Sequence, residues 1–162
     1  MTALPQDRIS SPTRLRDGQQ ILDIDHYAPF LLNAVSNAWQ RQTSAIYRAR
    51  FGLGIVDWRV LAMLNIEPEI TANRVCEVIR LDKAAVSRSL KLLHERALVA
   101  YAASATDPRK RRWWLTDKGQ AIHAEILAIA LECEAGMLAG IPADRLDIFL
   151  SVMRDMLANL DK

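Results

Sequence analysis

Near the middle of this 162-residue chain, two short helical segments follow each other with almost no connection between them. Thr71 is a suitable N-cap for a helix that reaches Ile79, and Asp82 is a suitable N-cap for a helix that continues to about Arg96. Only about three residues separate the two segments, so one helix must turn sharply against the other. This spacing predicts a helix-turn-helix arrangement, against which the rest of the chain must pack.

Helical periodicity continues on the N-terminal side of this pair. Apolar residues predict a long helix from about Asp25 to Gly52 and a second helix that contains Trp58 and stops at Pro68. The stretch before them, residues 1–22, is mostly polar and is interrupted by prolines and a glycine. We expect this stretch to form a flexible tail without a chemical role.

The chain on the C-terminal side of the pair changes character. After Ala97, two short runs of β-forming residues enclose a charged stretch, which predicts a two-stranded hairpin with a long basic tip over about 98–115. This hairpin is the only β structure that we expect. Two further helices are predicted over 116–137 and about 142–160, and the second of these has one strongly apolar face.

The net charge of the chain is only +2, but the charge is distributed unevenly. Residues 80–118 hold ten basic and four acidic side chains, whereas residues 119–162 hold three basic and seven acidic ones. A localised basic segment is typical of a surface that binds a polyanion. A solvated surface with a chance cluster of charges would have the same composition, so the charge alone leaves both interpretations open.

The second helix of the central pair has two different faces. Val86, Leu90 and Leu93 follow helical spacing and predict an inward-facing stripe. The opposite face and the exposed first turn form a short basic surface, which consists of Lys83, Ala84, Ala85, Ser87, Arg88 and Lys91. Such a surface suits the DNA major groove, where Arg and Lys contact guanine and phosphates and small residues allow close approach. Taken alone, it would also suit an ordinary amphipathic surface helix.

The hairpin tip carries a run of like charges, in the order Asp107, Pro108, Arg109, Lys110, Arg111 and Arg112. Adjacent cations repel one another, so the tip is best accommodated where phosphates neutralise it, although a solvated basic loop is the alternative. Asp107 can pair with Arg109 and hold its guanidinium outward, which suits a narrow, electronegative minor groove. We expect residues 109–112 to point to the same side of the molecule as the basic helix surface.

The order helix, tight turn, basic helix, strand, basic tip and strand resembles a known family. From about residue 25 to its end, the sequence is similar to the MarR (multiple antibiotic resistance regulator) family of transcription factors. Four blocks with matching spacing carry the resemblance: Ala85-Val86-Ser87-Arg88, Leu98-Val99, Asp107-Pro108-Arg109 and Leu115-Thr116-Asp117-Lys118-Gly119. No single block is specific, but their conjunction is.

The resemblance implies a mainly α-helical fold with a winged helix-turn-helix DNA-binding lobe, a two-stranded β wing and terminal helices that form a dimerisation lobe. Residues 23–162 would form a single domain, with the DNA-binding lobe at about 55–117 and dimer contacts at about 23–50 and 118–162. The homodimer would bind a palindromic double-stranded site, with the basic helix in the major groove and the wing tip in the minor groove. Independently, the last helix is too apolar and too near the chain end to be covered easily by its own domain, which favours pairing of two copies.

Two positions depart from the family pattern. Ala97 stands where a glycine usually ends the second helix of the pair, so a left-handed backbone at Ala97 would cost about 1 kcal/mol. Tyr101 stands where an arginine is common in the first wing strand, which weakens the expectation of a phosphate contact there. Neither departure removes the main pattern.

The resemblance also implies a small-molecule inducer, often an aromatic acid, bound between the dimer helices and the DNA-binding lobe. Trp39, Tyr47 and Trp58 lie on the helices that would line such a pocket, and Arg48 or Arg50 could meet a carboxylate. The alternative is that these aromatic side chains belong to the core.

Other classes of protein find little support in the residues. Cys76 and Cys133 are too few for a disulfide framework and, without a secretory signal or a membrane segment, they indicate a cytoplasmic protein. The three histidines are scattered, and no phosphate-binding loop or Ser/His/Asp signature is present. We therefore expect neither an enzyme nor a bound metal or cofactor.

The leading hypothesis is a sequence-specific transcriptional regulator, a repressor that a small ligand, such as an aromatic molecule, releases from DNA. One alternative is a winged-helix module whose basic wing contacts an acidic protein partner. A second alternative is a repressor that senses oxidation through a cysteine. Salt-sensitive binding to promoter DNA distinguishes the leading hypothesis from the first alternative.

Overall fold

The computed structural model describes residues 10–103 and 111–161, and these residues are mainly helical. The helices are α1 (Ala28–Phe51), α2 (Ile55–Ile66), α3 (Ala72–Ile79), α4 (Lys83–Glu95), α5 (Asp117–Met137) and α6 (Ala143–Leu160). The strands are β1 (Thr13–Arg16), β2 (Gln19–Leu22), β3 (Ile70–Thr71), β4 (Val99–Ala103) and β5 (Arg111–Leu115). The predicted mainly α-helical class is confirmed. Within the described part of the chain, no helix combines the length and the apolar character needed to cross a membrane.

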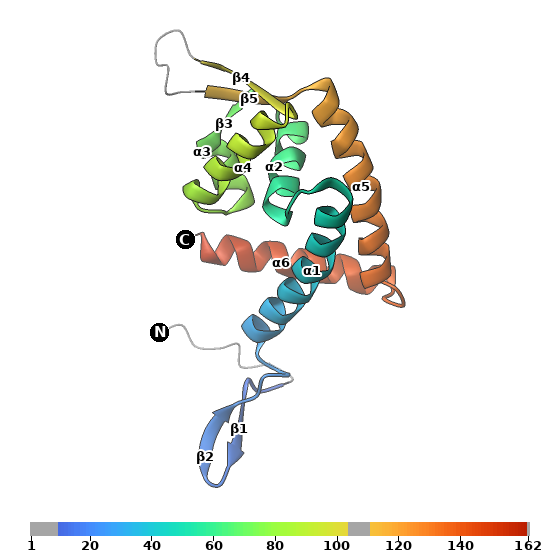
Figure 1. Cartoon of the computed structure of the whole chain (residues 1–162). Helices are drawn as coiled ribbons and strands as arrows, with labels where there is room; N and C mark the ends of the chain where they lie inside the picture. Colours follow the sequence, from blue (N-terminus) through green and yellow to red (C-terminus); the bar gives the residue numbers. More distant parts are fainter. Residues whose placement is uncertain (1–9, 104–110, 162) are drawn as a thin grey trace.

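Figure 1 shows that the central elements form one lobe. α2, α3 and α4 pack with an antiparallel sheet in the order β3, β5, β4, and α5 leaves this lobe as a long helix. α1 runs from the lobe toward the other end of the molecule, and α6 crosses below the lobe. The helix-turn-helix and the wing strands therefore lie together, as a winged helix-turn-helix.

The lobe is built around one apolar core. Most of its buried members come from α2, α3, α4, α5 and the sheet, and Tyr47 of α1 also belongs to it. These members include Val60, Leu61, Leu64, Val75, Val86, Leu90, Leu93, Val99, Trp113, Leu115 and Ile126. The α4 residues Val86, Leu90 and Leu93 are at most 2% exposed, which confirms the predicted inward stripe. Because this stripe faces the core, the opposite face of α4 points outward.

The predicted starts of the two central helices are confirmed by their capping hydrogen bonds. The hydroxyl of Thr71 accepts from the backbone N–H of Arg74 at 3.3 Å. Asp82 Oδ1 accepts from the backbone N–H of Ala85 at 2.9 Å. Each bond satisfies a backbone donor that has no partner within its helix, so these side chains determine where α3 and α4 begin.

The start of α5 packs closely against the wing. The hydroxyl of Thr116 accepts from the backbone N–H of Gly119 at 3.0 Å and lies 2.8 Å from the carbonyl oxygen of Ala97, to which it donates. A Cβ on Gly119 would lie only 1.9 Å from the carbonyl oxygen of Leu98, so a larger residue would force the backbone apart. The block from Leu115 to Gly119 therefore joins the wing to α5.

A buried carboxylate connects α4 to the start of α2. Asp57 is 9% exposed, and its Oδ2 accepts from the backbone N–H of Gly54 at 2.7 Å. Its Oδ1 accepts from the hydroxyl of Ser89, a buried residue of α4, at 2.7 Å. Both oxygens thus have a donor in a place with little water, as a buried charge requires. This pair adds a directional bond to the apolar stripe that holds α4.

The structure differs from the sequence-based prediction in its β content. β1 and β2 form an antiparallel hairpin within the stretch predicted to be a flexible tail, and β3 pairs with β5. The expectation that the wing is the only β structure is therefore wrong. Asp17 and Gly18, with φ of 53° and 76°, are the two central residues of the β1–β2 turn. Positive φ at both positions is typical of a type I′ turn, for which Asp-Gly is a strong sequence signal.

Ala97 has a φ of 57°, in the left-handed region where its Cβ is unfavourable. Ala97→Gly is therefore expected to raise the free energy of unfolding by about 1 kcal/mol, measured by urea denaturation with circular dichroism. The same change at Ala121, which is exposed in α5, is expected to lower this free energy by about 1 kcal/mol because glycine weakens a helix interior. A loss of stability in Ala97→Gly would contradict the left-handed backbone at this position.

Ser89→Ala removes the donor to the buried Asp57 carboxylate and is expected to lower the free energy of unfolding by about 1–3 kcal/mol. The matched control is Ser87→Ala on the exposed face of the same helix, for which we expect a change below about 0.5 kcal/mol. Urea denaturation of both variants measures the difference. Equal effects of the two substitutions would show that the bond to Asp57 does not hold α4.

Candidate nucleic-acid interface

The outward surface of α4 is basic and accessible. Lys83, Ala84, Ser87, Arg88 and Lys91 are exposed, and Ala85 is half-buried. Lys91 forms one long ion pair of 3.9 Å with Glu95, and Arg88 makes no hydrogen bond or ion pair with any described residue. The first turn of α4 also carries backbone N–H groups and the positive end of the helix dipole. We use the term basic helix face for six residues of α4: Lys83, Ala84, Ala85, Ser87, Arg88 and Lys91. All of them except Ala85 are exposed and therefore accessible to a partner.

The two arginines that begin β5 lie on opposite faces of the sheet. Arg112 Nη1 donates to the carbonyl oxygen of Glu69, next to β3, at 3.2 Å. Arg111 lies on the other face, which it shares with the buried Trp113, because side chains alternate along a strand. That face of the sheet packs on α4, since Trp113 contacts His94.

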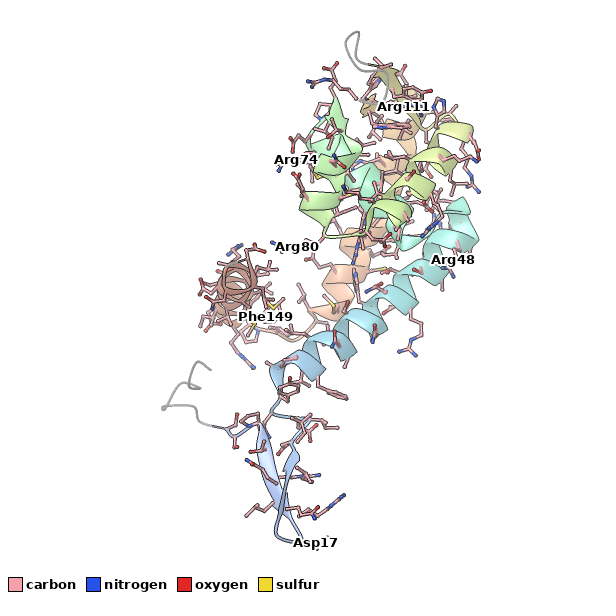
Figure 2. The ribbon with its side chains drawn as sticks, turned by 90° about the vertical axis from the view of Figure 1, so that its left-hand side faces the viewer. Asp17, Arg48, Arg74, Arg80, Arg111 and Phe149 are labelled. Carbon is pink, nitrogen blue, oxygen red and sulfur yellow. The ribbon has the colours of Figure 1, made fainter. Side chains whose placement is uncertain are left out.

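The expected common direction of residues 109–112 is therefore wrong for Arg112, whereas Arg111 lies on the α4 side. Figure 2 places Arg111 at the wing end of the molecule and Asp17, in the β1–β2 turn, at the opposite end. Asp107, Arg109 and Lys110 lie outside the described residues, so their minor-groove role stays a prediction.

Three rings connect the end of α4 to the wing. The ring of Tyr101 lies 5.0 Å from that of His94 and 4.7 Å from that of Trp113, measured between centroids. His94 Nδ1 lies 3.1 Å from the carbonyl oxygen of Val99 and donates to it. The guanidinium carbon of Arg111 lies 4.2 Å from the centroid of Tyr101. The sequence pattern at Tyr101 indicated only a lost cationic contact and did not predict this cluster.

The predicted ligand residues fall into two groups. Tyr47 is 1% exposed and its ring lies 6.2 Å from that of Trp58, which stacks on the buried His123 of α5 at 5.2 Å. Burial raises the pKa of Tyr47 and lowers the pKa of His123 from their ordinary values. Trp39 instead lines an apolar groove of about 420 Å³ between α1 and α6. The structure thus brings Tyr47 and Trp58 together with His123, which sequence analysis did not single out, but it does not bring Trp39 into that group.

The other candidate side chains have simpler surroundings. Arg48 and Arg50 are exposed near the end of α1. Cys76 and Cys133 are half-buried and pack against the apolar core.

A bidentate ion pair connects the helix-turn-helix to the last helix. Arg80, in the turn between α3 and α4, donates through Nη1 and Nη2 to the two carboxylate oxygens of Asp161 at 2.7 and 2.6 Å. The Arg80 guanidinium lowers the pKa of the Asp161 carboxyl below its ordinary value. Figure 2 shows Arg80 between the lobe and α6, so this pair joins α6 to the underside of the lobe.

Comparisons with known proteins agree with this architecture. The model of the MarR family matches residues 51–110, which run from the end of α1 through the helix-turn-helix into the wing. A MarR/EmrR family transcriptional regulator from Acinetobacter sp. ADP1 is 26% identical, with 86% of this chain and 99% of that chain covered and a TM-score of 0.79.

Two more distant structures share the same fold. MepR of S. aureus, solved as a complex with DNA, is 17% identical, with 84% of this chain and 98% of that chain covered and a TM-score of 0.73. CouR from Rhodococcus jostii RHA1, bound to p-coumaroyl-CoA, is 22% identical, with 85% of this chain and 94% of that chain covered and a TM-score of 0.71. The matched segment and the common fold show that this chain has the winged helix-turn-helix fold of MarR family transcriptional regulators and is similar to that family over residues 51–110.

Proposed function

We propose that this protein is a homodimer that binds a palindromic double-stranded DNA site and represses transcription until a small molecule releases it. The observation that carries the DNA-binding part is the basic helix face, whose cations are exposed beside the wing. MepR, which has the same fold and was solved with DNA, supports this assignment.

The chemistry of the basic helix face suits the major groove. Arg88 offers parallel N–H donors that match O6 and N7 of guanine. Ser87 can donate to or accept from a neighbouring base edge, and the alanines of the first turn allow close approach and contact with thymine methyl groups. Lys83 and Lys91, at the two ends of this face, would contact phosphates and so fix the register of α4 on the duplex.

The wing extends the same basic surface. We propose that Asp107, Arg109 and Lys110 follow their sequence-based prediction and enter the minor groove, with Arg109 as the inserted cation. Arg111 lies closer to the sheet and on the α4 side. A duplex contacting both α4 and the wing would meet most of the excess positive charge of residues 80–118.

The groove between α1 and α6 supports the homodimer. In the single chain no α6 side chain is buried, and Val35 of α1 and Phe149 of α6 remain 57% and 51% exposed. Apolar area of this extent on two neighbouring helices favours burial against another protein. A second copy presents the same two helices, so a two-fold interface buries both sets at once and places two basic helix faces on one duplex.

The ligand response is proposed on the similarity to CouR, which was solved with p-coumaroyl-CoA, and on the aromatic cluster at α2 and α5. Trp58 is half-buried and can meet a small aromatic molecule, whereas Tyr47 is covered and could do so only after a movement. Because Trp39 lines the groove proposed for the second copy, it is better assigned to the dimer contact.

The rival function is a winged-helix module that binds an acidic protein. The small residues Ala84 and Ala85 at the start of α4 favour DNA, because they add no specific contact to an acidic protein surface but allow the helix to enter a groove. The rival also predicts no salt-sensitive binding to DNA.

A duplex enriched by the wild-type protein from a random pool provides the probe for DNA binding. Arg88→Ala is expected to weaken binding to this duplex by roughly 5- to 150-fold and to relax base preference at one position in each half-site. Arg109→Ala is expected to weaken binding to DNA of every sequence by a similar factor. It should also reduce the salt slope, which is the slope of log affinity against log salt concentration, by about 1 per chain. Fluorescence anisotropy over a salt series measures both effects.

The matched control for these arginines is Arg16→Ala, which removes the same charge from the hairpin at the other end of the molecule. It should leave the dissociation constant within about twofold, apart from a small change in long-range attraction. Wild-type affinity in both Arg88→Ala and Arg109→Ala would contradict the proposed function.

Phe149→Glu places a charge in the apolar groove and is expected to convert the dimer to monomer at micromolar concentration, because the charge would be desolvated at the interface. Sedimentation velocity measures the mass, with Ser151→Glu as the control on the polar side of α6. A dimer that persists in Phe149→Glu, or a wild-type chain that sediments as a monomer, would contradict the proposed interface.

A further inference from the structure

Tyr101 occupies a fixed position between α4 and the second wing strand. In the sheet it lies directly opposite Trp113, and its half-buried ring packs against that residue and against His94. The bond from His94 to the carbonyl oxygen of Val99 holds the third ring in place. A ring supported on two sides in this way is a rigid surface at the end of α4.

Arg111 lies over that ring. Its guanidinium carbon is 4.2 Å from the ring centroid, well within the range of a cation–π contact. In the register of the hairpin Arg111 pairs with Ala103, two residues beyond Tyr101, so the contact is a diagonal one across the two strands. The side chain therefore bends back along the sheet toward α4.

The contact with Tyr101 leaves the donors of Arg111 available. A guanidinium that stacks on a ring uses its flat face, whereas its N–H groups point outward in the plane. Among residues 10–103 and 111–161, Arg111 has no ion pair and no hydrogen-bond acceptor. Arg112 differs, because its Nη1 already donates to the carbonyl oxygen of Glu69 on the other face of the sheet. Of the two arginines, only Arg111 combines a fixed direction with free donors.

We propose that Tyr101 is a positioning residue of the DNA interface, which holds the guanidinium of Arg111 toward a backbone phosphate beside α4. The partner is a phosphate and not a base, because Arg111 lies at the root of the wing and not on the face of α4 that would enter the groove. The substitution of tyrosine for a cation in β4 thus does not remove a phosphate contact, since the cation comes from β5. This inference rests on the proposed DNA-binding function.

Binding of the enriched duplex over a salt series tests the positioning role. Arg111→Ala is expected to weaken binding and to reduce the salt slope by about 1 per chain. Tyr101→Leu, which keeps Arg111 but removes the aromatic face, is expected to weaken binding roughly threefold or more. Tyr101→Phe keeps the ring and is expected to remain within about twofold of wild type. The double variant Tyr101→Leu/Arg111→Ala should bind no more weakly than Arg111→Ala alone, because both changes act on one contact.

Arg112→Ala is the matched control, because it removes the same charge from the opposite face of the sheet. It should leave the salt slope nearer to wild type than Arg111→Ala does. Equal slopes for the two alanine variants, or full wild-type binding by Tyr101→Leu, would overturn the proposal.

A second measurement on the free protein separates positioning from a loss of folding. The side-chain Nε–H proton of Arg111 lies near the Tyr101 ring, so its NMR signal should be displaced by the ring current in wild type and in Tyr101→Phe. The displacement should disappear in Tyr101→Leu while amide signals of α1, α5 and α6 stay unchanged. An undisplaced Arg111 signal in wild type would overturn the proposal without affecting the proposed function. If Arg88→Ala weakens binding but Tyr101→Leu does not, only this inference fails; if the wild-type protein enriches no duplex, the proposed function fails as well.

Discussion

The packing of one side of α4 into the core determines what the rest of this molecule can do. Val86, Leu90 and Leu93 are almost completely buried, and Ser89 donates to the buried carboxylate of Asp57. Apolar burial selects which side of the helix faces inward, and the hydrogen bond adds direction to that choice. The cations and small residues of the opposite side are exposed as a consequence, so the same packing that stabilises the lobe also presents the basic helix face.

Much of this arrangement follows from local sequence signals. Thr71 and Asp82 cap helices where their side chains predict, because a capping oxygen needs only the backbone of the next turn. The inward stripe of α4 follows from helical period alone. The left-handed backbone at Ala97, which the sequence analysis considered, is present in the structure. It is needed because the chain must reverse its direction directly after α4.

Features that depend on distant residues were not predictable in the same way. The contact between Tyr101 and Arg111 requires the register of two strands joined by a long tip, and alternation along β5 sends Arg112 to the other face. Trp39, Tyr47 and Trp58 share two neighbouring helices, but their separation depends on how α1 packs against α5 and α6. The β1–β2 hairpin is a different case. The Asp17-Gly18 pair is a sequence signal for a turn, but the polar composition around it favoured a flexible tail.

The fold places the basic and the acidic segments of the sequence in different parts of the molecule. The basic segment 80–118 contains α4 and both wing strands, whereas the acidic segment 119–162 contains most of α5 and all of α6. A polyanion would be attracted to the first region and repelled by the second, so the charge distribution favours one orientation of the molecule on DNA. Arg80 and Asp161 join these oppositely charged regions directly.

The central claim is that two copies of the basic helix face and the wing engage one duplex. Hydroxyl-radical footprinting of the enriched duplex tests this claim most directly, since it reports protection of the sugar–phosphate backbone at single nucleotides. The account predicts two protected regions on one face of the duplex, related by two-fold symmetry and centred about 34 Å, or one helical turn, apart. A single asymmetric protected region, or no protection at protein concentrations that saturate binding, would contradict it.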